Sequence, residues 1–248
     1  MSKISDALDK ADRERRLRAE AGEPEPQRPE LGPPLSRNVP DALWRELGMM
    51  RNLIESHLPS KKSRSLLVTS AATGEGVSSV TANFGRILAD DPAVNVLVVD
   101  ANPETPVQHE LFGVEKERGF VELVRGDVKS DEAVRVTARK NLCVIPSGTA
   151  TGGVFQLAGT ERVPGILTAL QARFQYLLLD APPVLSHPEA AVLGSHVDGV
   201  LLVVRALNTR REAAASARDA LTKSGCNVIG VVLNRYKYSI PEFIYRRV

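Results

Sequence analysis

The feature that most constrains this chain is a series of short, uninterrupted apolar runs that alternate with amphipathic segments after Ser65. Continuous apolarity is typical of strands buried on both faces, so each run predicts a strand and each intervening segment predicts a covering helix. We therefore expect an α/β fold, a doubly wound and mainly parallel sheet. The runs cover residues 66–68, 96–99, 142–145, 177–179, 200–204 and 228–233.

The rest of the 248 residues divides by composition. Residues 1–20 place their few apolar side chains on one helical face and predict a short amphipathic N-terminal helix. Residues 21–40 are rich in proline and nearly devoid of large apolar side chains, which predicts a disordered linker. Residues 41–234 form the predicted domain, and its first helix begins at Asp41 and ends near Leu58. Residues 235–248 form a basic tail that contains tyrosines.

Charge and cysteine content exclude several classes of protein. The formal net charge is only +2, so no overall field draws the chain to nucleic acid, and no nucleic-acid partner is expected. Cys143 and Cys226 each lie in an apolar run, which predicts reduced core thiols and a cytoplasmic location. The N-terminus lacks an apolar signal region, and no window approaches the ~18 apolar residues of a membrane helix.

The first apolar run leads into a loop, residues 69–79, that carries Gly74 and Gly76 and precedes a helix. Such a loop can direct successive backbone N–H groups toward an anion at the helix N-terminus, which suits phosphate. A tight turn without a ligand is the alternative interpretation. In a working P-loop a lysine precedes the Ser or Thr that holds Mg²⁺. Here Val77 stands at the lysine position, and Ser78 retains the hydroxyl.

Two carboxylates follow other apolar runs. Asp100 ends the second run and Asp180 ends the fourth, in the arrangement by which a Walker B aspartate holds Mg²⁺ or its waters. Taken alone, either residue is better explained as a helix cap or a loop carboxylate. Together with Ser78 they place polar oxygens at three strand ends of one sheet, which predicts a magnesium site there.

The order of these segments resembles a known family. The loop GEGVS, then VVVDANPETP, LLLDAPPVL, DGVLLVVR and VIGVVLN, resembles the bacterial tyrosine autokinases of capsular and exopolysaccharide synthesis, which are related to partition and septum-site ATPases. The resemblance covers about residues 41–234 and implies a P-loop NTPase-like fold. It further implies a cytoplasmic protein that binds ATP or ADP with Mg²⁺, forms a homo-oligomer, and associates at the inner membrane with a polysaccharide co-polymerase.

The resemblance also implies roles for individual residues. The nucleotide-binding residues would be Gly74, Glu75, Gly76, Val77, Ser78, Ser79 and, near the adenine, Asn234. The metal ligands would be Ser78, Asp100 and Asp180, with Asp100 as the catalytic base of an active form. The phosphoacceptors would be Tyr236, Tyr238 and Tyr245, for which an aromatic edge packed on the last strand is the alternative.

The chain departs from the family pattern at charged positions. Val77 replaces the loop lysine, Asn102 replaces the second aspartate of the acidic segment, and Glu104 replaces an arginine. Residues 44–51 do not reproduce the spacing of one Glu and two Arg that makes ring contacts in the family. Because phosphoryl transfer depends on neutralising phosphate charge, these changes predict weak nucleotide binding and weak or absent ATP turnover. Lys61, Lys62 and Arg86 are the cations considered as substitutes.

Three functions therefore stand as hypotheses. The first is a degenerate P-loop protein, a pseudoenzyme, that regulates or scaffolds exopolysaccharide synthesis or export. The second is an active tyrosine autokinase with a rewired phosphate site, and the third is a partition-type positioning ATPase. The histidines His109, His187 and His196 show no metal-ligand spacing, and surface or capping roles are expected for them.

Overall fold

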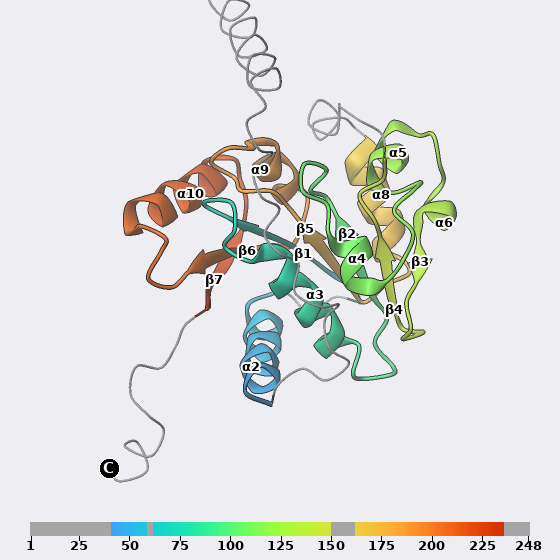
Figure 1. The fold of residues 1–248 in the computed structure, drawn as a ribbon, viewed down its shortest axis with the longest axis horizontal. Coiled ribbons are helices and arrows are strands. Elements are labelled where there is room, and N and C mark those ends of the chain that lie inside the picture. Colours follow the sequence, from blue (N-terminus) through green and yellow to red (C-terminus); the bar gives the residue numbers. More distant parts are fainter. Residues whose placement is uncertain (1–40, 59–61, 150–161, 236–248) are drawn as a thin grey trace, which may run out of the picture. The chain divides into compact units, whose positions relative to one another are not determined.

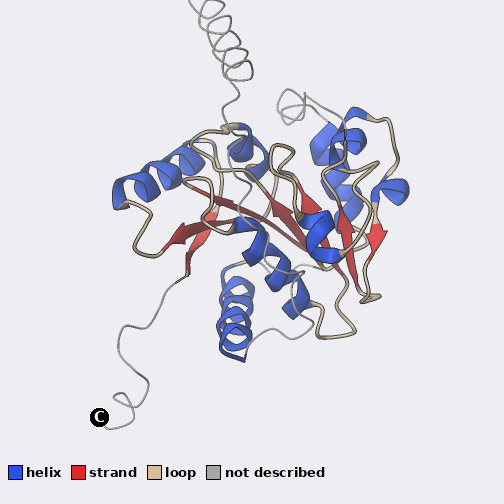
Figure 2. Ribbon diagram, in the orientation of Figure 1, coloured by secondary structure: helices blue, strands red, loops and turns tan. Residues whose placement is uncertain are grey.

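The computed structural model describes residues 41–58, 62–149 and 162–235. These residues form a seven-stranded sheet in the order β3-β4-β2-β5-β1-β6-β7 (Figures 1 and 2). All neighbouring strands run parallel except β3, which pairs antiparallel with β4 at one edge. The predicted doubly wound, mainly parallel fold is confirmed. The predicted helix and linker of residues 1–40 lie outside the described residues, as does the tail from Tyr236 onward.

The elements have the following bounds, with the labels of Figure 1. The strands are β1 (Arg64–Ser70), β2 (Val96–Asp100), β3 (Arg135–Val136), β4 (Leu142–Ile145), β5 (Tyr176–Asp180), β6 (Gly199–Arg205) and β7 (Val228–Asn234). The helices are α2 (Asp41–His57), α3 (Val77–Leu88), α4 (Gln108–Phe112), α5 (Phe120–Arg125), α6 (Ser130–Ala133), α8 (Arg162–Gln171), α9 (Glu189–Gly194) and α10 (Arg211–Lys223). The sequence predicted every strand except β3.

The central strands are buried on both faces, as their unbroken apolarity requires. On β1, Leu66 and Val68 contribute to one core cluster, whereas Leu67 contributes to the other. The first cluster lies under α2 and α3, and the second lies under helices that include α5, α8, α9 and α10. Cys143 and Cys226 are buried free thiols of the second cluster. The helices therefore cover the two faces of the sheet.

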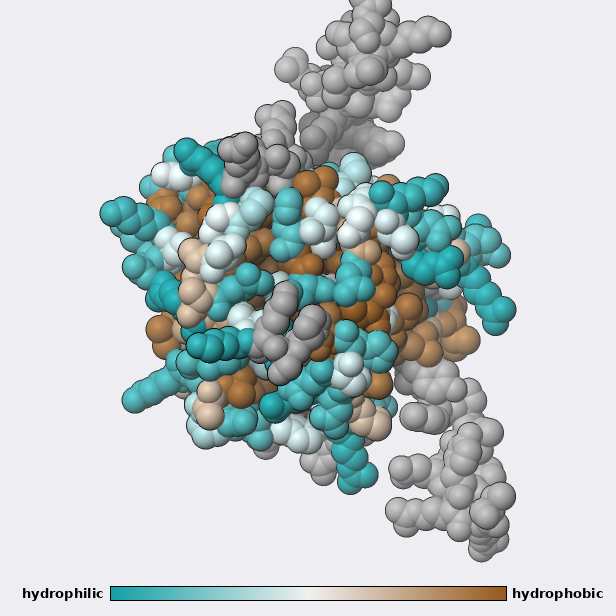
Figure 3. All heavy atoms as spheres, turned by 180° about the vertical axis from the view of Figure 1, so that it is seen from behind, coloured by the Kyte–Doolittle hydropathy of each residue, from teal (hydrophilic) through white to brown (hydrophobic). Residues whose placement is uncertain are grey.

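The edge strand β7 differs from the centre because its side chains are only partly covered. Val231 is 58% exposed and Leu233 is 54% exposed. Seen from behind, hydrophobic residues gather on part of the surface among hydrophilic ones (Figure 3). Across residues 41–58, 62–149 and 162–235, no helix has the length and apolarity needed to cross a membrane.

Candidate functional site

The loop after β1 holds an unusual backbone conformation at its glycines. Gly74 has φ of 81° and Gly76 has φ of 92°, both in the left-handed region that favours glycine. Gly76 immediately precedes α3, and its carbonyl accepts the backbone N–H of Val80 at 3.0 Å. A Cβ at Gly76 would lie 2.1 Å from Nδ2 of Asn234, so both conformation and space require glycine there.

Glu75 stabilises this loop from within. Its side chain is buried, and Oε2 accepts the backbone N–H groups of Ala71 at 2.9 Å and Ala72 at 3.2 Å. The hydroxyl of Thr209, from the segment between β6 and α10, donates to Oε1. The Glu75 side chain therefore bonds to the protein itself and fixes the start of the loop.

Asn234 reaches the same loop from the end of β7. Its Nδ2 donates to the Glu75 carbonyl at 2.8 Å, and its Oδ1 accepts the backbone N–H of Arg235 at 2.8 Å. The structure therefore brings Asn234 to the loop residues with which the family resemblance associated it. Its contact with an adenine stays a prediction.

Val77 occupies the first position of α3 and is almost fully buried, at 9% exposure. It belongs to the core cluster under α2 and α3, together with Val80 and Phe84. An apolar side chain packed into the core thus stands where the family resemblance places a lysine. Ser78 is half-buried beside it, and Ser79 is exposed, with its carbonyl accepting Nδ2 of Asn83 at 2.9 Å.

The cations considered as substitutes for the lysine do not lie at this loop. Arg86 is in the last turn of α3, about 13 Å along the axis from Val77 at 1.5 Å per residue. It donates to the Leu111 carbonyl at 3.3 Å. Lys62 precedes β1 and therefore lies at the amino-terminal end of that strand, opposite the glycine loop. Lys61 is outside the described residues.

The strand order brings two other arginines to the carboxyl ends of the strands, where the glycine loop lies. Arg205 ends β6 and pairs in register with Asn234, and Arg235 follows β7 directly. Both strands run parallel to β1, so their carboxyl ends lie on the same side of the sheet as the glycine loop. Sequence reasoning missed these residues because only the order of the strands places them there.

Asp100 is completely buried at the end of β2, and its carboxylate closes the following loop. Oδ1 accepts the backbone N–H of Asn102 at 3.2 Å, and Oδ2 accepts those of Val107 at 3.1 Å and Gln108 at 3.0 Å. Burial, and then the charge of neighbouring Asp180, raise the pKa of Asp100 well above its ordinary value. Both oxygens are thus already engaged by the backbone.

Asp180 ends β5 and lies in register beside Asp100. Burial raises the pKa of its carboxyl to about 6, although hydrogen bonds from the side chains of Gln108 and Ser78 oppose this shift. Oδ1 of Asp180 is buried without a hydrogen-bond partner among the described residues. The structure therefore brings together Ser78, Asp100 and Asp180, with one carboxylate oxygen left unsatisfied.

Gln108, the first residue of α4, is a site residue that sequence reasoning missed. It is fully buried, and its Nε2 donates to Oδ2 of Asp180 at 2.7 Å and to the carbonyl of Ser78 at 3.1 Å. Its Oε1 has no partner within the part of the chain that the structure describes. No local pattern marks a glutamine as buried, so only the fold reveals this contact.

The two other changed positions have acquired contacts of their own. Asn102 donates through Nδ2 to the Thr105 hydroxyl at 3.0 Å, within the loop after β2. Glu104 lies 3.5 Å from Nε2 of His187, whose Nδ1 lies 3.0 Å from the carboxylate of Glu189. Glu104 thus links the loop after β2 to the loop after β5.

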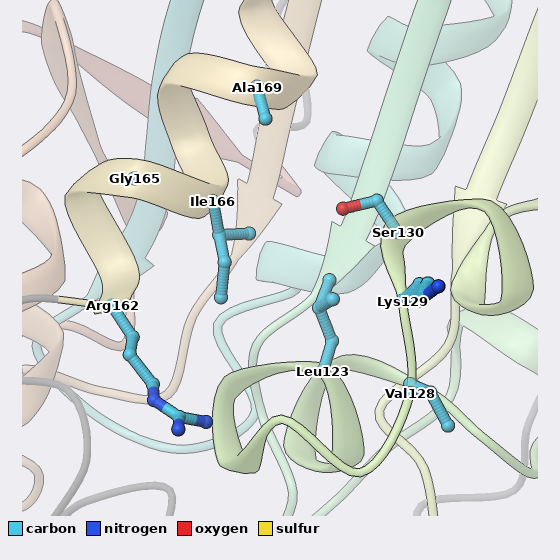
Figure 4. A pocket seen from close by; sticks show the side chains of 8 residues that line it. All are labelled: Leu123, Val128, Lys129, Ser130, Arg162, Gly165, Ile166 and Ala169. Atoms are coloured by element: carbon cyan, nitrogen blue, oxygen red, sulfur yellow. The ribbon is translucent and has the colours of Figure 1, made fainter.

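A separate hollow of about 410 Å³ lies between α5, α6 and α8 (Figure 4). Leu123 and Ile166 reach into it, and Arg162 extends toward α5, where it donates to the carbonyl of Arg125. None of the strand-end residues lines this hollow. Its lining is Leu123, Val128, Lys129, Ser130, Arg162, Gly165, Ile166 and Ala169.

Comparisons with known proteins agree with this architecture. No protein-family model matches the chain. The chain is 28% identical over 190 residues to the tyrosine-protein kinase YwqD of Bacillus subtilis, covering 77% of this chain and 80% of YwqD. It is 26% identical over 198 residues to the tyrosine-protein kinase Wzc of Salmonella typhi, of which it spans only 27%.

Solved structures show the same fold. The kinase domain of the Escherichia coli tyrosine kinase ETK matches with a TM-score of 0.72 at 22% identity, covering 80% of this chain and 79% of that domain. The septum-site protein MinD of Pyrococcus horikoshii, complexed with Mg-ADP, matches with a TM-score of 0.60 at 22% identity over 75% of this chain and 76% of MinD. The chain thus has the α/β fold of these structures, and the relatives that it matches in sequence are named as bacterial tyrosine-protein kinases.

Proposed function

We propose that this chain is a degenerate P-loop protein that regulates or scaffolds exopolysaccharide synthesis or export and has weak or no ATP turnover. We further propose a cytoplasmic location at the inner membrane through a polysaccharide co-polymerase, and self-association into a homo-oligomer. The observation that carries this proposal is that Val77, the first residue of α3, packs an apolar side chain into the core. The loop before it keeps the left-handed backbone conformation at its glycines.

The residues present fit a nucleotide in part. The backbone N–H groups of residues 74–79 would hold phosphates, and Ser78 and Asp180 offer the oxygen ligands that Mg²⁺ prefers. The unpartnered Oδ1 of Asp180 supports this assignment. When bound, Mg²⁺ would neutralise charge on the phosphates. Asp100 would act by orienting the loop after β2, since its oxygens hold backbone amides.

The missing lysine has a calculable consequence. A hydrogen bond to a charged group contributes roughly 1.5 to 3 kcal/mol, which corresponds to a ten- to hundredfold loss of triphosphate affinity. The same positive charge would act on the transferring phosphoryl group, so turnover should fall at least as much. Weakened binding of diphosphate would remain, because the backbone N–H groups of the loop still contact the phosphates without the lysine.

ATP hydrolysis and autophosphorylation of the purified full chain with Mg²⁺ test this proposal. We expect both rates to stay at the level of the Asp180→Ala variant, which removes the magnesium ligand. Asp219→Ala, which removes an exposed carboxylate on α10, serves as the matched control. Turnover that is abolished by Asp180→Ala and retained by Asp219→Ala would contradict the proposal.

An active tyrosine autokinase with a rewired phosphate site is the second candidate, and the position of two arginines favours it. Arg205 and Arg235 lie at the same sheet edge as the glycine loop, where one of them would have to replace the lysine. In that case Arg205→Ala or Arg235→Ala would abolish turnover. Phosphorylation of Tyr236, Tyr238 or Tyr245 in protein from its native cell, measured by mass spectrometry, would also favour the kinase.

A further inference from the structure

The amide of Gln108 lies between two oxygens that belong to different parts of the site. Its Nε2 donates to Oδ2 of Asp180 at 2.7 Å and to the carbonyl of Ser78 at 3.1 Å. Gln108 is fully buried and Asp180 is 1% exposed, so water does not compete for these bonds. A neutral N–H₂ group thus supplies the positive charge density that faces the carboxylate.

Two oxygens of this cluster have no partner. Oε1 of Gln108 and Oδ1 of Asp180 are both buried and lack a hydrogen bond to any described residue. Most buried polar atoms in folded proteins are paired, and an unpaired one requires an explanation. The unpartnered Oδ1 of Asp180 is an oxygen of the kind that hard divalent cations take as a ligand. The cluster therefore offers a carboxylate for a cation, with the amide of Gln108 bonded to the other oxygen of that carboxylate.

The backbone of Gln108 is fixed independently of its side chain. Its N–H donates to Oδ2 of Asp100 at 3.0 Å, as does that of Val107 at 3.1 Å. These bonds hold the start of α4 in place. The loop therefore does not depend on the side-chain amide of Gln108 for its position, and loss of the bonds to Asp180 and Ser78 would leave these backbone bonds in place.

We propose that Gln108 is an internal competitor for the divalent cation: its amide nitrogen occupies a cation position beside the carboxylate of Asp180 and must leave before a cation binds. This proposal rests on the proposed function, since it concerns the metal of the same nucleotide site, and it adds a second cause of weak binding to the loss of the lysine. It concerns a side chain that the family resemblance does not mark.

Binding of Mn²⁺ alone to the full chain, measured by electron paramagnetic resonance, tests the proposal. Gln108→Leu removes the competing amide, and we expect it to bind Mn²⁺ about tenfold more tightly than the unmodified chain. Gln171→Leu is the matched control, because Nε2 of Gln171 donates to the Ser65 hydroxyl at 2.8 Å, at the opposite edge of the sheet. The control should bind Mn²⁺ as the unmodified chain does.

Three results would overturn the proposal. Equal affinity in Gln108→Leu and the unmodified chain would show that the amide does not compete. Weaker binding in the variant would show that Oε1 is itself a ligand, and no Mn²⁺ binding by either protein would show that no cation site lies behind the amide. ADP binding and ATP turnover are measured separately, so failure of the proposed function is distinguishable from each of these results.

A second variant keeps the test decisive if Gln108→Leu folds poorly. Gln108→Glu places a third carboxylate beside Asp100 and Asp180, and a cation at the amide position would relieve the repulsion. We expect Mn²⁺ to raise the melting temperature of Gln108→Glu by several degrees and to leave that of Gln171→Glu unchanged. Equal shifts in both variants, or none in either, would contradict the proposal.

Discussion

The loops after β1 and β2 both follow the carboxyl ends of parallel strands, but the first keeps a backbone geometry suited to an anion and the second does not keep the charges of the family pattern. In the loop after β1, Gly74 and Gly76 keep the left-handed conformation that exposes backbone N–H groups. In the loop after β2, Asp100 and Asn102 bond to that loop itself, and Glu104 faces His187. The backbone geometry of a loop depends on glycines that the fold requires. The charge of a loop depends on single side chains, which can be replaced without altering the backbone geometry.

The largest expected effect concerns the glycine loop. Gly76→Ala would force alanine into the left-handed region and place its Cβ against Nδ2 of Asn234. Together these should lower the free energy of unfolding by about 3 kcal/mol, from strain and from loss of the bond to the Glu75 carbonyl. Denaturant unfolding measures this change. Gly74→Ala is the control, since its Cβ meets nothing within 4 Å, and it should cost only about 1 to 2 kcal/mol.

Equal losses of stability in Gly76→Ala and Gly74→Ala would contradict the claim that Asn234 requires a glycine at position 76. Equal losses would mean that conformation alone matters and that the contact with Asn234 contributes nothing. The loop would then be a turn without a fixed neighbour, and the assignment of Asn234 to the site would lose its support.

A smaller effect, of opposite sign, is expected at Asp180. Its pKa is raised from 3.8 to about 6, so the native state binds more protons than the unfolded state between these values, and stability falls as pH rises through this window. Asp180→Asn removes the buried charge and should stabilise the protein above pH 6, by about 2 to 3 kcal/mol at most. Below pH 4 the gain should vanish.

Thermal unfolding of the two proteins at several pH values measures this difference. The neutral asparagine keeps an acceptor for Nε2 of Gln108, so the comparison isolates the charge. A variant that is less stable at pH 7.5 would contradict the assignment of Asp180 as a carboxylate kept for function at a cost in stability.

The smallest effect concerns Glu104 in the loop after β2. Glu104→Arg restores the cation of the family pattern and should tighten ADP binding a few-fold, less than restoration of the lysine, because this side chain is half exposed. Calorimetry measures the affinity. Glu115→Arg makes the same charge change at an exposed position and controls for the overall field. Equal gains in both variants would show that only net charge matters.

The sequence predicted the parts of this molecule that depend on local pattern. Unbroken apolar runs predicted the buried strands, and the predicted helix of residues 41–58 corresponds to α2, Asp41–His57. The antiparallel strand β3 was not predicted, because it has only two residues, Arg135 and Val136, and no apolar run. Tertiary pairing alone defines it.

The site was predictable only where it follows from strand ends. Asp100 and Asp180 could be placed at one edge of the sheet, but their side-by-side register depends on the adjacency of β2 and β5. Gln108 carries no local signal because its burial results from the closure of the loop by Asp100. The substitute cations also depend on the three-dimensional fold. Arg86, considered from the sequence, lies in the last turn of α3, far from the glycine loop, whereas strand order places Arg205 on the side of the sheet that carries the loop.

Calorimetric titration of ADP with Mg²⁺ into the unmodified chain and into Val77→Lys tests the central claim most directly, namely that the phosphate loop keeps its backbone geometry but has lost its cation. Restoration of the lysine should tighten binding by ten- to a hundredfold. If the unmodified chain already binds ADP as tightly as Val77→Lys does, another cation serves the phosphates and the account is contradicted.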